Sequence, residues 1–229
     1  MDNNRIINIA IDGPAGAGKS TIAKRVAKEL GCIYVDTGAM YRAMALFLLR
    51  SGIAADDADA ISRKCREADI SISFENGEQV VTLNGENVNA YLRTEEVGNM
   101  ASASSVNGDV REKLVELQQA LGKKTSVVMD GRDIGTVVLP DAQVKIYLTA
   151  GVEVRAMRRY KEYLEKGEPA DLAAIEEQIR ERDWRDMHRD ISPLRKADDA
   201  VEVDSSDLNI EETLEKILTI VEEKISGMN

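Results

Sequence analysis

The chain has 229 residues, of which 43% are hydrophobic and 31% charged, and its formal net charge is −11. This composition is typical of one globular α/β core with insertions, and it excludes a disordered chain or two large domains. The acidic balance argues against a general nucleic-acid binder, which would need a basic surface. It leaves room for a local basic pocket that binds one small anion.

Signals for export or membrane insertion are not recognisable in the sequence. Residues 1–5 show no signal-peptide pattern, and no apolar run approaches the ~20 residues that cross a bilayer. Cys32 and Cys65 are far apart and form no CxxC pair, which is typical of a reduced cytosolic protein. We therefore expect a cytoplasmic protein, a monomer, with neither membrane nor nucleic acid as a partner.

Five short apolar runs alternate with amphipathic segments. The first run, Ile6–Ile11, precedes a Gly-rich turn and a helix that we expect to end at Gly31. The other four runs are Cys32–Val35, Ser126–Met129, Val144–Leu148 and Ala200–Val203. Helical spacing between them is shown by Tyr41, Met44, Ala45 and Leu48, by Val110, Leu114, Leu117 and Leu121, and by Ile210, Leu214, Ile217 and Val221. This alternation predicts an α/β fold with a parallel five-stranded sheet covered by helices.

Two stretches depart from this alternation. Ile70–Phe74 alternates apolar and polar side chains, and Gln79–Leu83 is strand-like again after Asn76-Gly77. Asn-Gly indicates a type I′ hairpin turn, because both central residues need positive φ. We therefore expect residues 64–100 to form a small antiparallel insert. Residues 153–195 are dense in charge and poor in large apolar side chains, and we expect a mobile helical hairpin there.

A phosphate-binding motif follows the first predicted strand. The residues that match G-x-x-x-x-G-K-[ST] are Gly13, Pro14, Ala15, Gly16, Ala17, Gly18, Lys19 and Ser20. Its glycines let consecutive backbone N–H groups face one anion, and the next helix directs its positive end there. Lys19 would reach the β- and γ-phosphates of ATP, and the Ser20 hydroxyl would bind Mg²⁺. A chance Gly-rich turn is the alternative, but the flanking strand and helix match the context that the motif requires.

The remaining sequence narrows the class of nucleotide-binding protein. A GTPase would need DxxG and NKxD motifs, and neither occurs in the chain. Small-molecule kinases are therefore the leading class, and a non-catalytic ATP-sensing module is the alternative.

Polar residues follow two predicted strands, where ligands gather in open α/β sheets. Thr37 follows one of these strands, and Arg42 lies on the helix that comes next. Arg42 would either face the phosphate crevice and bind a second phosphate or be an exposed helix arginine. Asp130 ends another strand and resembles a Walker B carboxylate that holds Mg²⁺ or its waters. Arg132 could clamp an acceptor phosphate and Asp133 could accept a hydrogen bond from an exocyclic amine. A charged turn with internal pairing is the alternative.

The charged hairpin carries several arginines. Arg182, Arg185 and Arg189 recur at i, i+3 and i+7, and Asp186 is four residues after Arg182, so we expect all four on one helix stripe. Arg158 lies on the first helix of the hairpin. These cations would either neutralise a transferring phosphoryl group from a closing lid or pair with neighbouring carboxylates on a solvated face.

Three blocks carry the most specific pattern in the sequence: Ile11–Thr21, Asp36–Arg42 and Asp130–Val138. Together they resemble the bacterial cytidylate kinase family, and the similarity extends over nearly the whole chain. The resemblance implies transfer of the γ-phosphoryl group of ATP to CMP or dCMP, with Mg²⁺ as cofactor. It also implies a P-loop core (residues 1–63, 101–152 and 196–229), a CMP-binding insert (64–100) and a lid (153–195).

The resemblance further implies roles for individual residues. Residues 13–20, Thr21 and Arg158 would bind ATP. The positions near the CMP phosphate and sugar are Thr37, Arg42, Arg132, Arg182 and Asp186. The positions that would read cytosine are Ser102, Arg111, Asp133 and Arg189, of which Ser102 and Arg111 carry no signal in periodicity. From the phosphate motif, the Walker B-like strand end and the hairpin arginines described above, we expect catalysis to depend on Lys19, Asp130, Arg132 and Arg182, with Mg²⁺ held by Ser20 and, through water, by Asp130.

Overall fold

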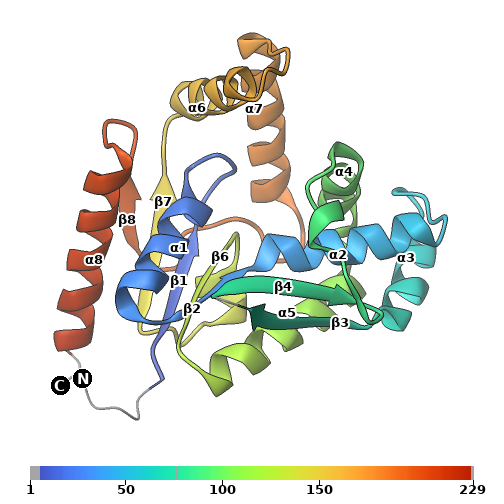
Figure 1. The fold of residues 1–229 in the computed structure, drawn as a ribbon, viewed down its shortest axis with the longest axis horizontal. Helices are drawn as coiled ribbons and strands as arrows, with labels where there is room; N and C mark the ends of the chain where they lie inside the picture. Colours follow the sequence, from blue (N-terminus) through green and yellow to red (C-terminus); the bar gives the residue numbers. More distant parts are fainter. Residues whose placement is uncertain (1–5, 76, 228–229) are drawn as a thin grey trace. The chain divides into compact units, whose positions relative to one another are not determined.

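The computed structural model describes residues 6–75 and 77–227. Its strands form a five-stranded sheet in the order β2-β6-β1-β7-β8 and a three-stranded sheet in the order β3-β4-β5 (Figure 1). The strands are β1 (Asn8–Asp12), β2 (Ile33–Asp36), β3 (Ile70–Glu75), β4 (Glu78–Leu83), β5 (Glu86–Asn87), β6 (Val127–Gly131), β7 (Val144–Thr149) and β8 (Val201–Asp204). All five apolar runs of the sequence are therefore strands of the larger sheet, as predicted.

Helical segments connect these strands. The α-helices are α1 (Lys19–Leu30), α2 (Thr37–Arg50), α3 (Ala58–Lys64), α4 (Glu95–Ser104), α5 (Gly108–Lys124), α6 (Val152–Glu165), α7 (Leu172–His188) and α8 (Ile210–Ser226). Shorter helical turns are η1 (Cys65–Glu67), η2 (Asn89–Tyr91) and the π-helical η3 (Ile134–Val138). The chain divides into two compact units: residues 33–127 belong to unit 1, and residues 7–32 and 128–227 belong to unit 2.

Unit 2 contains the parallel strands that support the phosphate motif. Strand β1 pairs in parallel with β7, and β7 pairs in parallel with β8. Four of the five β1 residues are buried, which explains the nearly continuous apolar run. Helix α1 ends, as predicted, at Gly31 in the left-handed conformation with φ 65°. Helix α8 begins with a capping box between Asn209 and Glu212.

Unit 1 contains the predicted hairpin. Strands β3 and β4 pair antiparallel with Glu75 opposite Glu78, so the connecting loop has two residues. Gly77 has φ 82°, as a type I′ turn requires, whereas Asn76 lies outside the described residues. The antiparallel strands occupy only part of the range expected for the insert. Helix α4 begins at Glu95, because Thr94 caps its first turn by accepting a hydrogen bond from the Val97 N–H.

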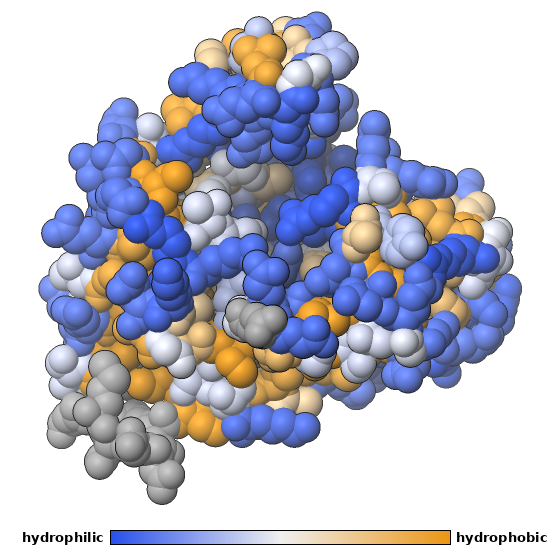
Figure 2. Space-filling model, in the orientation of Figure 1, coloured by the Kyte–Doolittle hydropathy of each residue, from blue (hydrophilic) through white to orange (hydrophobic). Residues whose placement is uncertain are grey.

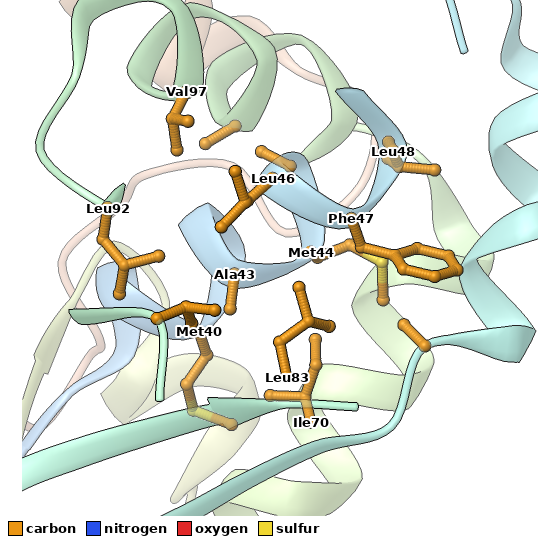
Figure 3. Close-up of a cluster of buried hydrophobic side chains, with 14 of the residues drawn as sticks. Met40, Ala43, Met44, Leu46, Phe47, Leu48, Ile70, Leu83, Leu92 and Val97 are labelled. Atoms are coloured by element: carbon orange, nitrogen blue, oxygen red, sulfur yellow. The ribbon is translucent and has the colours of Figure 1, made fainter. Parts of the chain in front are cut away.

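The apolar core of unit 1 is built around helix α2. Met40, Met44 and Leu48 of this helix are completely buried, and Ile70 and Leu83 from the hairpin belong to the same cluster (Figure 3). A strand pair alone is marginally stable in water, so this helix supplies the surface on which the hairpin folds. The cluster thereby joins the hairpin to the helix that carries Thr37 and Arg42.

The charged segment 153–195 folds as two helices, α6 and α7, as predicted (Figure 1). Ala156, Ile175 and Ile179 form a small apolar cluster between them, supported by Tyr160 and other partly buried neighbours. The expectation that Arg189 continues the stripe of α7 is wrong. The helix ends at His188, and Arg189 has the extended angles φ −68° and ψ 143°.

The face of the molecule in Figure 2 is predominantly hydrophilic, with hydrophobic side chains scattered among charged ones. Among the described residues, no helix is long and apolar enough to span a membrane. Cys32 and Cys65 are both free thiols.

Candidate active site

The phosphate motif of unit 2 connects β1 to α1. Gly13 has φ 151°, and a Cβ atom at this position would collide with the carbonyl oxygen of Leu148, so the close approach to β7 requires glycine. Gly18 caps α1 with φ 86° and offers no side-chain acceptor to the first turn. In contrast, α2, α5, α7 and α8 begin with Asp or Asn side chains that accept backbone N–H groups. The first turn of α1 is therefore left available for an anionic ligand.

Lys19 lies in the interior of this loop. Its side chain is only 6% exposed, and its Nζ donates a hydrogen bond of 2.7 Å to the Pro14 carbonyl. Burial and the charge of Arg132 lower the pKa of Lys19 to about 7, although Asp130 and Asp12 act in the opposite direction. A bound polyphosphate would favour the charged form, so the site is arranged to acquire its full charge when the ligand arrives.

Ser20 and Asp130 form the pair expected of a magnesium site. The Ser20 hydroxyl donates a hydrogen bond of 2.9 Å to Oδ2 of Asp130, at the end of β6. No cluster of three or more His, Cys, Asp or Glu ligands occurs in the described part of the chain. Magnesium commonly uses one or two protein oxygens together with substrate phosphates and water, so one hydroxyl and one carboxylate fit this ion.

Asp12 directly precedes the phosphate loop, and the sequence reasoning did not single it out. It is 5% exposed, and its two carboxylate oxygens accept hydrogen bonds from the N–H groups of Ile134 (2.8 Å) and Gly135 (2.7 Å). Burial raises the pKa of Asp12 to about 6 despite these two bonds. The bonds tie the residue before the phosphate loop to the turn after Arg132 and Asp133. A polar residue at the end of an apolar strand was the available signal.

The turn after β6 directs two further residues toward α7. Arg132 Nε donates a hydrogen bond of 2.8 Å to Asp186. Burial alone would raise the pKa of Asp186, but the charge and hydrogen bond of Arg132, together with the charges of Arg182 and Arg189, lower that pKa below the ordinary value. Arg189 and Asp133, both buried, lie with Nη2 and Oδ1 3.8 Å apart. Both of these contacts therefore run between the turn and the segment 153–195.

The other arginines expected in the hairpin, and Thr21 of α1, differ in exposure and in hydrogen-bond partners. Arg182 is half-buried on α7, whereas Arg185 is exposed. Arg158, expected to bind ATP, donates to the Ser205 carbonyl (2.6 Å) and contacts the Ser205 hydroxyl (3.3 Å), after β8. Thr21 lies exposed in the first turn of α1.

Arg155 is a second residue that sequence reasoning missed. Its buried guanidinium donates to the Ala150 carbonyl (2.8 Å), the Ala15 carbonyl (2.9 Å) and Asp183 (2.6 Å). One side chain thus joins the phosphate loop to both helices of the hairpin. Nothing in the spacing distinguished it from its arginine neighbours, because the bonds involve residues up to 140 positions away.

Four expected acceptor residues lie in unit 1. Thr37 is buried at the start of α2, and Arg42 is half-buried one turn later. Arg111, 3% exposed on α5, donates to the Ser105 carbonyl at 3.2 Å and lies 5.5 Å from the ring centre of Tyr41. Ser105 in turn donates its hydroxyl to the Ser102 carbonyl at 2.9 Å. Ser102 and Arg111 are therefore linked through one intervening serine.

The parallel sheet, the phosphate loop and its Ser–Asp pair define a P-loop kinase fold. Solved structures agree: a gluconokinase from Sinorhizobium meliloti 1021 has a TM-score of 0.50 at 13% identity, over 98% of this chain and 97% of that one. An uncharacterised protein from Eubacterium ventriosum has a TM-score of 0.51 at 13% identity, over 96% of this chain and 99% of that one.

The family itself is given by sequence. The cytidylate kinase family model matches residues 9–223, and the chain belongs to this family. A cytidylate kinase from Caldicellulosiruptor saccharolyticus is 51% identical over 93% of this chain and 95% of the relative. Another cytidylate kinase, from Geobacillus sp. WCH70, is 48% identical over 98% of this chain and 100% of the relative. A cytidylate kinase from Lactobacillus johnsonii is 49% identical over 96% of each chain.

Proposed function

We propose that the protein catalyses transfer of the γ-phosphoryl group of ATP to CMP or dCMP, in the cytoplasm, for pyrimidine nucleotide metabolism. The proposal depends above all on the contacts made by the turn Asp130–Asp133. Asp130 contacts Ser20 of the phosphate loop, while Arg132 and Asp133 approach Asp186 and Arg189 of the hairpin. The carboxylate proposed for the donor side and the side chains proposed for the acceptor side thus lie within one four-residue segment, which supports the proximity that transfer between two bound phosphates requires.

The reaction needs no covalent enzyme intermediate. An oxygen of the CMP phosphate attacks the γ-phosphorus in line, and the bond between the γ-phosphorus and the bridging oxygen of ADP breaks. Phosphomonoesters have a second pKa near ~6, so the attacking oxygen is largely ionised at neutral pH and requires no strong base. His188, the single histidine of the sequence, is exposed and stacked on Trp184, which is consistent with no role as a base.

Charged and polar residues of the two units would each contribute to the remaining steps of binding and catalysis. Lys19 neutralises the transferring group, and the arginines of the hairpin add positive charge around its oxygens. Magnesium, held by Ser20 and through water by Asp130, would neutralise the β- and γ-phosphate charge. For the acceptor, unit 1 would contribute Thr37 and Arg42 toward the phosphate and Ser102 and Arg111 toward cytosine. Unit 2 would contribute Arg132 toward the phosphate and Asp133 and Arg189 toward cytosine.

A panel of acceptors tests the proposal. ADP release would be measured with ATP, Mg²⁺ and, in turn, CMP, dCMP, UMP, AMP, GMP, shikimate and gluconate. We expect strong turnover with CMP and dCMP, weak turnover with UMP and none with the others. Turnover only with shikimate or gluconate would identify another small-molecule kinase, and bound ATP with silence across the panel would indicate a sensing module.

The chemical step has its own test. Quenched samples taken during turnover with γ-labelled ATP should contain labelled CDP and no labelled protein. Recovery of a phosphorylated enzyme that reacts onward with CMP would overturn the direct in-line transfer.

A further inference from the structure

Gln79 of strand β4 binds the main chain of Asp36, the last residue of β2. Its Oε1 accepts the Asp36 N–H at 2.8 Å, and its Nε2 donates to the Asp36 carbonyl at 3.1 Å. A side-chain amide has one acceptor and two donors, so it can satisfy both groups of one residue as a neighbouring strand would. Both residues belong to unit 1.

Asp36 is the residue on which the start of α2 depends. Its Oδ1 accepts the Ala39 N–H at 3.0 Å and caps the helix, while Arg93 contacts its Oδ2 at 3.2 Å. A Cβ atom at Gly38 would lie 3.1 Å from Asp36 Oδ1 and 3.2 Å from Arg42 Nη1. The Asp36 carboxylate and the Arg42 guanidinium therefore lie against the same glycine, and Thr37 lies between Asp36 and that glycine in sequence.

Gln79 is itself held in place by the insert. It shares a face of β4 with Val81 and Leu83, which are buried in the apolar cluster of unit 1. The Asn89 side chain donates to the Gln79 carbonyl at 2.8 Å and accepts the Val81 N–H at 2.9 Å. A half-buried polar side chain at the end of an apolar stripe is unfavourable unless it forms hydrogen bonds. Here both the oxygen and the nitrogen of the Gln79 amide are hydrogen-bonded.

We propose that Gln79 is a positioning residue for the acceptor phosphate. It fixes the main chain of Asp36 and thereby the first turn of α2, which presents Thr37 and Arg42. The insert would then act on the phosphate end of the acceptor through one amide side chain. This inference rests on the proposed function and concerns the same site.

The chain offers a matched control at Gln143. Like Gln79, it is a half-buried glutamine whose Oε1 accepts a backbone N–H, that of Asn8 at 2.7 Å, and whose Nε2 donates to a carbonyl, that of Asp141 at 3.3 Å. It lies in unit 2, and none of its bonds involves an expected acceptor residue. Gln→Met at either position keeps length and removes the same polar groups.

The experiment compares Gln79→Met, Gln79→Glu and Gln143→Met with the unmodified protein. Each is assayed for the KM of CMP, the KM of ATP, kcat and the midpoint of urea unfolding. Two lost hydrogen bonds that orient the phosphate-binding turn should raise the KM of CMP roughly tenfold, with the KM of ATP within about twofold. Glu at position 79 can accept the N–H but cannot donate to the carbonyl, so an intermediate increase is expected.

The outcomes separate the inference from the proposed function. If the unmodified protein does not phosphorylate CMP, the proposed function fails. If it does, and Gln79→Met changes the KM of CMP no more than Gln143→Met at a similar loss of stability, Gln79 is merely structural and the inference is overturned. An equal rise in the KM of ATP would also overturn it, because the effect would not be confined to the acceptor.

Discussion

Units 1 and 2 both bury apolar side chains, but they differ in how many charged side chains they bury. The core of unit 1 is an extended apolar cluster around α2, and Arg111 is its one buried charged residue among those described. In unit 2 the buried charged residues are Asp12, Lys19, Asp130, Asp133, Lys145, Arg155 and Asp183. Burying charge costs stability unless each group is paired, so unit 2 carries a cost that unit 1 largely avoids, and its buried charges include Lys19 and Asp130 of the candidate site.

The largest expected contrast comes from replacing Lys19 with Met. Removing a buried cation from the phosphate loop should lower kcat by about 10²–10³-fold. The pKa of Lys19 falls from its ordinary 10.5 to about 7 on folding, so the unfolded chain binds more protons between these values. Its stabilising contribution is therefore present above pH 10.5 and lost as pH falls through 7.

The ligand-free Lys19→Met variant should consequently be more stable than the unmodified protein at pH 6, and the gain should shrink toward pH 9. Thermal unfolding at both pH values, alongside the kinetic assay, measures the two effects. A variant that is inactive and also less stable at pH 6 would contradict the account of buried charge in unit 2.

The second contrast concerns Leu48, which is completely buried in unit 1. Leu48→Ala should lower the free energy of unfolding by about 2–5 kcal/mol, because it removes apolar contacts and leaves a cavity. In urea titrations it should therefore behave oppositely to Lys19→Met, while kcat below the unfolding transition stays within about threefold. Loss of activity in a fully folded Leu48 variant would show that the apolar cluster also tunes the site.

The third test uses Asp133→Ala, which removes a carboxylate expected to meet the exocyclic amine of cytosine. Selectivity for CMP over UMP, taken as the ratio of kcat/KM values, should fall by roughly 10–100-fold. Arg185→Ala, an exposed position on α7, serves as a control for surface charge on the hairpin. Unchanged selectivity in the Asp133 variant would remove that residue from cytosine recognition.

The fourth test concerns the pH dependence of stability set by Asp12. Its pKa rises from the ordinary 3.8 to about 6 on folding, so its contribution is fully present below pH 3.8 and lost as pH rises through 6. The difference in unfolding free energy between the unmodified protein and Asp12→Asn should decline across this window, by at most about 3 kcal/mol. Urea titrations at pH 4, 5 and 6.5 would measure it, with Asp57→Asn, a helix cap that retains its acceptor, as control. If the difference in unfolding free energy from the unmodified protein changed with pH in the same way for Asp12→Asn and Asp57→Asn, a raised pKa at Asp12 would be contradicted.

Sequence reasoning was most successful where local rules decide the outcome. The phosphate loop, the end of α1 at Gly31 and the 75–78 hairpin follow from backbone freedom and turn chemistry, which neighbouring residues control. It was less successful at the ends of the charged helices. Arg189 was expected on the stripe of α7, but the periodicity of charged residues does not show where a polar helix stops.

The sequence by itself determined the alternation of strands and helices, the position of the phosphate loop and, through its motifs, the family. Only the tertiary structure decided which charged or polar groups meet: Arg132 with Asp186, Arg155 with Asp183, and Gln79 with Asp36. The physical reason is that several arginines and carboxylates have equivalent local patterns. Their pairing depends on loop lengths, strand register and burial over separations of 28 to 54 residues, which no local window contains.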